Sequence, residues 1–282
     1  MRASVLFPAL LLGFATSAAG HLAAQGVVIA PHVIFIDNRV RSAAVELYNP
    51  GTDPIEADLE IFFGYPVTDS AGQFVLRTVE HPDSTLPSAA AWIQAFPRKI
   101  VIGPQRTQTV RLLGRPPANL PDGEYWARLK VSAMAGQVPI QGAPDDTGAV
   151  QVRINLQVNT VMPVLYRKGA VSTGVRVSNL SLSRQGPDSL RFGASFAREG
   201  NAAFLGTIRI AVVDTAGQVV AQARQPTTVY FTMDPRLVLS APKLPAGRYK
   251  LRLELASERE DLPATALLQI PPVIDSIEVT LP

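Results

Sequence analysis

The segment 150–158 alternates strictly between apolar and polar side chains. Its apolar positions are Val150, Val152, Ile154, Leu156 and Val158. Successive side chains of a β-strand point to opposite faces, so this pattern predicts a strand with one apolar face. Burial of each such side chain contributes about 1.5–3 kcal/mol. What covers this face is therefore the main question that the sequence raises.

The same alternation recurs at short intervals, separated by turn-forming residues. It predicts strands over 42–48, 55–63, 91–95, 100–102, 107–113 and 125–133. Pro31 interrupts the apolar run 27–36, which predicts an edge strand with a bulge or a switch. No segment has a capped helical period. Strands spaced by about 8–12 residues with turns between them are typical of an all-β sandwich.

Two short segments of the first half recur in the second half, in the same order. Asp69–Val75 matches Asp214–Val220, and Leu120–Tyr125 matches Leu244–Tyr249. In the second pair a tyrosine follows a turn at the start of a strand, which resembles the tyrosine corner of immunoglobulin-like sandwiches. The chain is therefore predicted to contain two tandem immunoglobulin-like β-sandwiches, over 26–168 and 169–282.

Residues 1–25 are predicted to be a cleaved secretory signal peptide. Arg2 precedes an apolar run, Val5–Ala18, and small residues follow it. The run is too short for a membrane span, and no second apolar run of 18 residues follows. We therefore expect the mature chain to be exported.

Composition excludes several functional classes. The chain has no cysteine, so thiolate metal sites and cysteine nucleophiles are excluded. Its formal net charge is +3 without a run of five Lys or Arg, so nucleic acid is not an expected partner. No catalytic or phosphate-binding motif is present, and the acidic residues at 145–146 and 258–261 are interpreted as solvated loops. We expect no enzymatic activity, no cofactor and no metal.

Three segments carry a resemblance to a known family. They are Val27–Phe35, Ser42–Gly51 and the stretch Phe96–Leu112, with its Pro-Arg-Lys-Ile-Val-Ile, Gly-Pro turn and Thr-Val-Arg-Leu. Together they are similar to the N-terminal domain of periplasmic pilus-assembly chaperones of the chaperone–usher pathway. The resemblance covers about 27–168, and the second domain resembles that family only in class.

The resemblance implies donor-strand complementation. The chaperone would lend alternating side chains of its last first-domain strand to an incomplete sandwich in an exported, β-rich, pilus-like subunit. The implied subunit-binding residues are Val150, Val152, Ile154, Leu156, Val158 and His32. It also implies a periplasmic location, an outer-membrane usher as a further partner and no cofactor.

The chain departs from the family pattern at its charged anchor. Members of the family hold the subunit's C-terminal carboxylate with an Arg on the first strand and a Lys on the last, where this chain has His32 and Pro163. A neutral histidine donates one hydrogen bond and lacks the guanidinium fork. Arg167 and Lys168 lie four and five residues further on, about 13–16 Å along a strand. The apolar face is therefore expected to supply most of the grip.

Two hypotheses remain at the level of sequence. In the first, the chain is a divergent periplasmic chaperone that lends the strand at 150–158. In the second, it is an exported structural or adhesive protein with tandem sandwiches, and this strand only closes its own core. From the alternation alone a private core strand is favoured, and the resemblance favours a lent strand.

Overall fold

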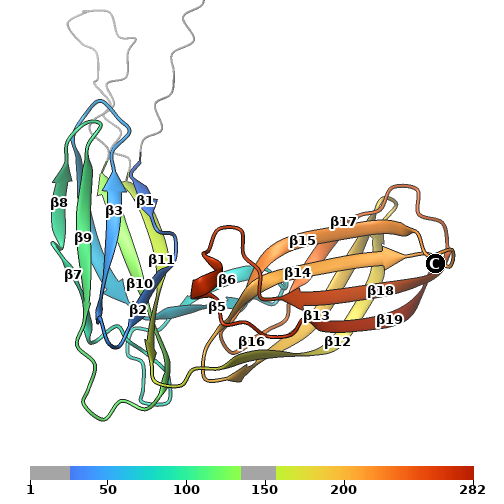
Figure 1. The fold of residues 1–282 in the computed structure, drawn as a ribbon. Coiled ribbons are helices and arrows are strands. Elements are labelled where there is room, and N and C mark those ends of the chain that lie inside the picture. The colour runs from blue at the N-terminus through green and yellow to red at the C-terminus, as the bar shows by residue number, and fades with distance from the viewer. Residues whose placement is uncertain (1–25, 135–156) are drawn as a thin grey trace, which may run out of the picture.

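The computed structural model describes residues 26–134 and 157–282. Within them the chain forms two β-sandwiches, and the second extends sideways from the lower end of the first (Figure 1). This confirms the predicted all-β, tandem-sandwich fold. The residues described contain no helix that is long and apolar enough to cross a membrane.

The first sandwich consists of a four-stranded and a five-stranded sheet. The four-stranded sheet has the order β1-β3-β9-β7, with β1 Val28–Ala30, β3 Ser42–Tyr48, β9 Thr107–Gly114 and β7 Ile93–Phe96. The five-stranded sheet has the order β2-β11-β10-β4-β8, with β2 Ile34–Asp37, β11 Gln157–Lys168, β10 Gly123–Met134, β4 Ile55–Phe62 and β8 Lys99–Ile102. After β4, the chain forms a separate hairpin of β5 (Gly64–Thr68) and β6 (Phe74–Thr78).

The alternation of each strand places its apolar residues between the two sheets. The core of the first sandwich includes Val45, Leu47, Leu59, Ile102, Val110, Leu112, Leu129 and Val164. The polar residues of the same strands, such as Glu46 and Asp58, are exposed. Burial of the alternating face is thus what pairs the two sheets.

The N-terminal strand switches sheets at Pro31. Before it, β1 pairs antiparallel with β3; after it, β2 pairs parallel with β11. Proline lacks the N–H that a continuous ladder would need, so the chain changes partners at this residue. The predicted switch is confirmed.

The second sandwich is also built from two sheets. The first contains β12 (Thr173–Gly186), β13 (Ser189–Gly200), β16 (Thr232–Met233) and β17 (Arg236–Ser240). The second has the order β15-β14-β18-β19, with β15 Val219–Val229, β14 Phe204–Val213, β18 Gly247–Ala256 and β19 Val273–Leu281. A short 3₁₀ turn, η1 (Ala264–Ala266), lies between β18 and β19. The core includes Phe192, Phe196, Phe204, Ile210, Val212, Leu251 and Leu253.

The two repeated sequence segments have the same local structure in both sandwiches. The side chain of Asp69 accepts hydrogen bonds from the backbone of Ala71 and Gln73, at 2.9 and 2.8 Å. Asp214 repeats this with Ala216 and Gln218, at the same distances. The glycine of each turn has a positive φ, 78° at Gly72 and 83° at Gly217, which glycine adopts without steric cost.

The two predicted tyrosine corners are present. The hydroxyl of Tyr125 donates to the carbonyl oxygen of Pro121 at 2.9 Å. The hydroxyl of Tyr249 donates to that of Pro245 at 2.8 Å. Each bond ties the start of a core strand to the preceding turn, as in immunoglobulin-like domains.

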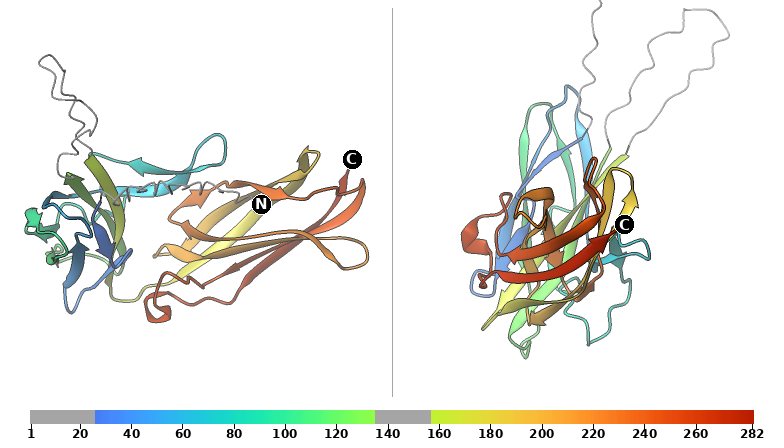
Figure 2. Two further views of the ribbon diagram at one scale, coloured as in Figure 1. Left: turned by 90° about the horizontal axis from the view of Figure 1, so that it is seen from above. Right: turned by 90° about the vertical axis from the view of Figure 1, so that its right-hand side faces the viewer.

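A third apolar cluster joins the two sandwiches. It combines Val33, Phe63, Tyr65, Trp126 and Leu165 of the first with Ala203, Leu205, Tyr230, Leu262 and Leu267 of the second. The connection runs through Gly169, whose φ of +62° and close approach to Asp122 exclude a side chain there. The hairpin β5–β6 also runs along the side of the second sandwich (Figure 2).

We expect Tyr125→Phe and Tyr249→Phe each to lower the free energy of unfolding by about 0.5–1.5 kcal/mol, because each removes one hydrogen bond. Urea denaturation followed by circular dichroism measures the change. Unchanged stability in both variants would contradict a role of the corners in holding the turns.

Candidate functional site

The candidate site is the part of β11 that has a neighbouring strand on one side only. β11 pairs with β10 along its whole length. On its other side it pairs with β2 only between Val164 and Arg167. Among the residues that the structure describes, the stretch 157–163 therefore forms an open edge of the five-stranded sheet (Figure 1).

The odd-numbered residues of this stretch point their backbone groups at the open edge. On the β2 side, the N–H of Asn38 donates to the carbonyl oxygen of Arg167 at 3.0 Å. Trp126 of β10 lies opposite Leu165, but its backbone N–H donates to the carbonyl oxygen of Pro87 at 2.7 Å and not to β11. In an antiparallel pair, every second residue exchanges both backbone hydrogen bonds with the residue opposite. Leu165 and the other odd-numbered residues of β11 therefore do not bond to β10, and the even-numbered residues do. The unpaired N–H and C=O groups are therefore those of Gln157, Asn159 and Val161.

The outward-facing N–H groups of Gln157, Asn159 and Val161 end at Pro163, which has no backbone N–H. It lies opposite Arg128 and has the same parity as Leu165. The N–H that proline lacks would therefore have pointed at the open edge, so no hydrogen bond between β10 and β11 is lost. This is the orientation in which an edge strand tolerates proline.

The even-numbered side chains of β11 point into the first sandwich. Met162, Val164 and Tyr166 are buried in its core. Val158, on the same face, is half-buried and lies opposite Ala133. Val158 is thus on the face expected for an apolar continuation of the core. The other predicted strand residues, Val150, Val152, Ile154 and Leu156, lie outside the described residues.

The open edge of β11 belongs to a sandwich whose other sheet also ends in an edge strand. That strand is β1, which pairs only with β3 among the described residues. Ile29 of β1 is buried in the core, whereas Val28 is exposed. Because the chain crosses from one sheet to the other at Pro31, β1 and the open part of β11 form the two borders of the sandwich on this side (Figure 1).

His32 lies at the lower end of this open side. It is exposed and comes two residues before β2 begins. Asp261 of the second sandwich is bound by Arg259, whose hydrogen bonds at 2.7 and 2.5 Å are the main reason that the pKa of Asp261 is lowered. Among the described residues, His32 has no side-chain hydrogen bond or ion pair, so its imidazole is open to solvent.

Arg167 and Lys168 are engaged in structural contacts. The Nε of Arg167 donates to the buried carboxylate of Glu124 at 2.8 Å, and its Nη1 donates to the carbonyl oxygen of Ala266 at 2.7 Å. Lys168 pairs with Asp122 at 3.2 Å. The backbone N–H of Ala170 and then Lys168 lower the pKa of Asp122. Arg167 therefore joins the two sandwiches through Glu124 and Ala266, and Lys168 binds the turn at Asp122 beside the connection at Gly169.

Glu124 is the polar centre of the junction, a role that no sequence motif predicts. Besides Arg167, its carboxylate accepts hydrogen bonds from the indole of Trp126 at 2.9 Å and from the backbone N–H of Ala203 at 3.0 Å. A charged residue directly after the turn Leu120–Gly123 and before two aromatic residues is the only local signal for it.

Further arginines are stacked on aromatic rings at this junction. The guanidinium of Arg128 lies 5.0 Å from the ring centre of Tyr230, and its Nε donates to the carbonyl oxygen of Gly64 at 2.8 Å. Arg198 lies 5.6 Å from the ring of Trp126. Burial lowers the pKa of Arg198 and raises that of Tyr230. Cation–π attraction in these contacts stabilises the buried Arg128 and the partly buried Arg198.

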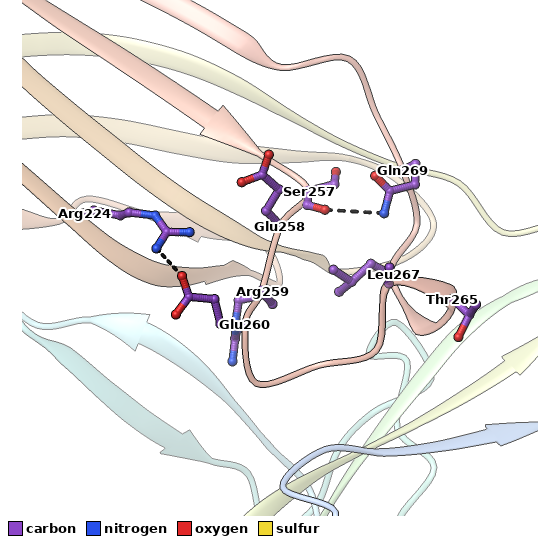
Figure 3. A pocket seen from close by; sticks show the side chains of 9 residues that line it. Arg224, Ser257, Glu258, Arg259, Glu260, Thr265, Leu267 and Gln269 are labelled. Carbon is purple, nitrogen blue, oxygen red and sulfur yellow. Dashed lines mark hydrogen bonds and ion pairs between the residues drawn. The ribbon is translucent and has the colours of Figure 1, made fainter.

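A pocket of about 530 Å³ lies near the loop after β18 (Figure 3). Its charged residues bind each other: Arg224 pairs with Glu260, and Arg209 outside it pairs with Glu258. Gln269 donates to the carbonyl oxygen of Ser257 at 3.4 Å. Across 26–134 and 157–282, no group of His, Asp and Glu could hold a metal ion.

No protein-family model matches the sequence, and no curated protein matches it. The fold is similar to several solved structures. One is the CupB2 chaperone of Pseudomonas aeruginosa, with 11% identity over 90% of this chain and 100% of that one, and a TM-score of 0.42. Another is the SafA pilin in complex with the SafB chaperone of Salmonella enterica, with 11% identity, 89% and 96% coverage and a TM-score of 0.44. A third is the CsuC–CsuE chaperone–tip adhesion subunit pre-assembly complex of Acinetobacter baumannii, with 14% identity, 90% and 98% coverage and a TM-score of 0.44.

We expect Glu124→Ala to lower the free energy of unfolding by about 3–5 kcal/mol, because it leaves the largely buried guanidinium of Arg167 without its carboxylate. Urea denaturation followed by tryptophan fluorescence measures this. The matched control is Glu60→Ala, which removes an exposed pair with Lys130 on the neighbouring strand and should change stability by about 1 kcal/mol or less. Equal effects of the two substitutions would show that the junction does not depend on Glu124.

Proposed function

We propose that this chain is a periplasmic chaperone that caps exported, β-rich, pilus-like subunits through the open edge of β11. The observation that carries the proposal is the stretch 157–163. Its outward backbone groups have no partner strand within 26–134 and 157–282, and the alternate side chains of the same strand enter the core. An uncovered ladder of this kind is a template for another strand. Strand addition to a sheet edge is an established mode of peptide recognition.

In the proposed mechanism the backbone and the side chains of β11 have separate tasks. The outward groups of Gln157, Asn159 and Val161 bond to a strand of the subunit. The apolar side chains fill the open groove of the subunit's incomplete sandwich. Val158 has the parity that this requires. The predicted residues Val150, Val152, Ile154 and Leu156 continue that parity, each contributing about 1.5–3 kcal/mol when covered.

We further propose that the affinity for the subunit comes mainly from apolar contacts and main-chain pairing, without a charged anchor. His32 is an exposed imidazole without the guanidinium fork of arginine, and Pro163 offers neither charge nor a backbone donor. Arg167 and Lys168 are held by Glu124 and Asp122. Main-chain pairing and apolar burial would then supply most of the affinity.

The remaining parts of the proposal concern cellular context. The predicted signal peptide at 1–25 supports export to the periplasm. An outer-membrane usher is proposed as the partner that receives the capped subunit. The proposed role uses no cofactor, metal or catalytic residue.

We expect Asn159→Pro to abolish subunit capture while the protein stays folded. The substitution removes an N–H that faces the open edge, and Pro163 shows that β11 tolerates proline at this parity. The chain would be tagged at its C-terminus and purified from the periplasm of its own host. The measurement is the stoichiometry of an exported β-rich partner, identified by mass spectrometry.

The matched control is Thr160→Pro. The N–H of Thr160 faces β10, so this proline removes a hydrogen bond inside the sheet and should lower the melting temperature. If Asn159→Pro retains a partner at the wild-type stoichiometry, the open edge is not the binding site.

We expect Ile154→Asp to distinguish the two hypotheses for the strand at 150–158, which either is donated to a subunit or only closes the chain's own core. If the strand is lent, the variant loses the subunit but melts at the wild-type temperature, because the charge enters only the interface with the subunit. If the strand closes the chain's own core, as in a structural or adhesive protein, the buried charge unfolds the first sandwich. Thermal melting by circular dichroism distinguishes the outcomes, with Gln157→Asp as a control on the polar face.

A further inference from the structure

The outer face of one sheet of the second sandwich carries a regular row of cations. On β18, which lies between β14 and β19, Leu251 and Leu253 enter the core. The alternate residues Arg248, Lys250 and Arg252 are exposed on the opposite face. We call these three residues the cationic row. Alternate Cα atoms of a strand are about 6.4–6.8 Å apart, so the charges follow one line at a constant spacing.

The cationic row is not neutralised by its neighbours. The other charges of this face are paired with each other across 26–134 and 157–282: Arg209 with Glu254 and Glu258, and Arg224 with Glu260. Glu278 of β19 lies opposite Lys250 in the register, but the two form no ion pair. The positive charge of the row is therefore available to a partner.

Two hollows adjoin the cationic row. One, of about 680 Å³, is lined by Arg252 and by Gln222 of β15. Ala211 of β14 lies between these two residues in the sheet, and its short side chain leaves space between their long ones. The other hollow, of about 540 Å³, is lined by Arg248 and Lys250. The row is thus accessible along its whole length.

We propose that the cationic row binds an extended acidic segment of a partner protein, with carboxylates at every second position. An extended segment of this kind has the same period of about 6.4–6.8 Å, so each carboxylate meets one cation. The two arginines can each bind a carboxylate through two parallel hydrogen bonds. Recognition of acidic motifs by clustered arginines is an established mode of peptide binding.

The carboxylates beside the row favour a single peptide chain over an anionic membrane. Glu278 projects from β19 to the same side as the row, and Glu254 continues the row on β18. A flat anionic surface would meet these carboxylates as well and be repelled by them. A chain that follows β18 meets the three cations alone.

The acidic residues of this chain itself are less suitable. Glu56, Asp58 and Glu60 alternate on β4 and are exposed. However, Asp58 is paired with Lys99 at 3.2 Å. Glu60 is paired with Lys130 at 2.7 Å. A segment of another protein is therefore favoured over a second copy of this chain. The inference does not depend on the proposed chaperone function, because it uses the other sandwich and no group of β11.

Fluorescence anisotropy with labelled peptides tests the period of the row. The probe is Asp-Thr-Asp-Thr-Asp-Thr-Asp, because threonine favours an extended backbone. The comparison peptide, Asp-Asp-Asp-Asp-Thr-Thr-Thr, has the same composition. We expect the alternating peptide to bind at least threefold more tightly. Raising NaCl from about 50 to about 500 mM should weaken it about tenfold, because salt screens exposed charges. Equal affinity for the two peptides would overturn the proposal.

Neutralising the row should remove most of the affinity for the alternating peptide. We expect the triple variant Arg248→Gln, Lys250→Gln and Arg252→Gln to bind it about tenfold more weakly, since three exposed charge pairs are lost. Circular dichroism verifies that the variant is folded. If the triple variant is unstable, the single substitution Lys250→Gln should still weaken binding at least twofold, and unchanged binding would overturn the proposal.

A matched control removes the same charge elsewhere. It combines three exposed positions of the first sandwich: Arg98→Gln, Arg106→Gln and Arg111→Gln. This control should bind the alternating peptide like the wild-type protein. An equal loss in both triple variants would show that only net charge matters, which would contradict a site on β18.

Two further measurements address the other occupants. Vesicles of phosphatidylglycerol and phosphatidylcholine should bind the wild-type protein and the row variant equally. Sedimentation velocity should show the same association state for both. If instead the row variant alone loses vesicle binding or self-association, the row belongs to a membrane or to a second copy, and the proposal is wrong.

Discussion

The register between β10 and β11 fixes the direction of each group that matters in the first sandwich. It places Met162, Val164 and Tyr166 in the core and Leu165 and Arg167 on the outer face, against the second sandwich. It also turns the odd-numbered backbone groups toward β2 or toward the open edge. A slip by one residue would exchange the two faces of β11 and destroy both the core and the junction.

The two ends of β11 therefore differ. The end at 164–167 has a neighbouring strand on both sides, whereas the stretch 157–163 has one on a single side among the described residues. At its lower end β11 lies between β10 and β2, and Arg167 is bound by Glu124. In its upper part, 157–163, β10 is the only strand that pairs with it among the residues described. Pairing with β10 along 157–168 holds the backbone of β11 in an extended form, so an added strand would meet an edge that is already a β-strand. This is the physical basis for proposing strand addition at β11.

The junction between the sandwiches combines apolar burial with a small number of charges. Glu124 is satisfied by three donors, from Trp126, Arg167 and Ala203. The neighbouring arginines lie on aromatic rings, where the π-electrons offset part of the cost of burying a cation. Because these contacts come from both sandwiches, they also define how the second sandwich and the β5–β6 hairpin are placed.

Local patterns of the sequence were sufficient for much of the fold. The alternation predicted the strand at 42–48 and its neighbours, and the repeated turns predicted both tyrosine corners. Pro31 predicted a bulge or a switch, and the structure shows that the chain changes sheets there. These features depend on residues a few positions apart. They therefore follow from side-chain parity, turn geometry and the missing N–H of proline.

The sequence by itself determined where strands and turns form, and it marked 150–158 as an apolar strand, most of which lies outside the described residues. Only the tertiary structure decided which part of β11 lacks a neighbouring strand among the described residues, and that Glu124 binds Arg167 and Ala203. These facts join residues that are far apart along the chain. Alternation gives the faces of a strand but not its neighbours, since pairing depends on the packing of all strands together.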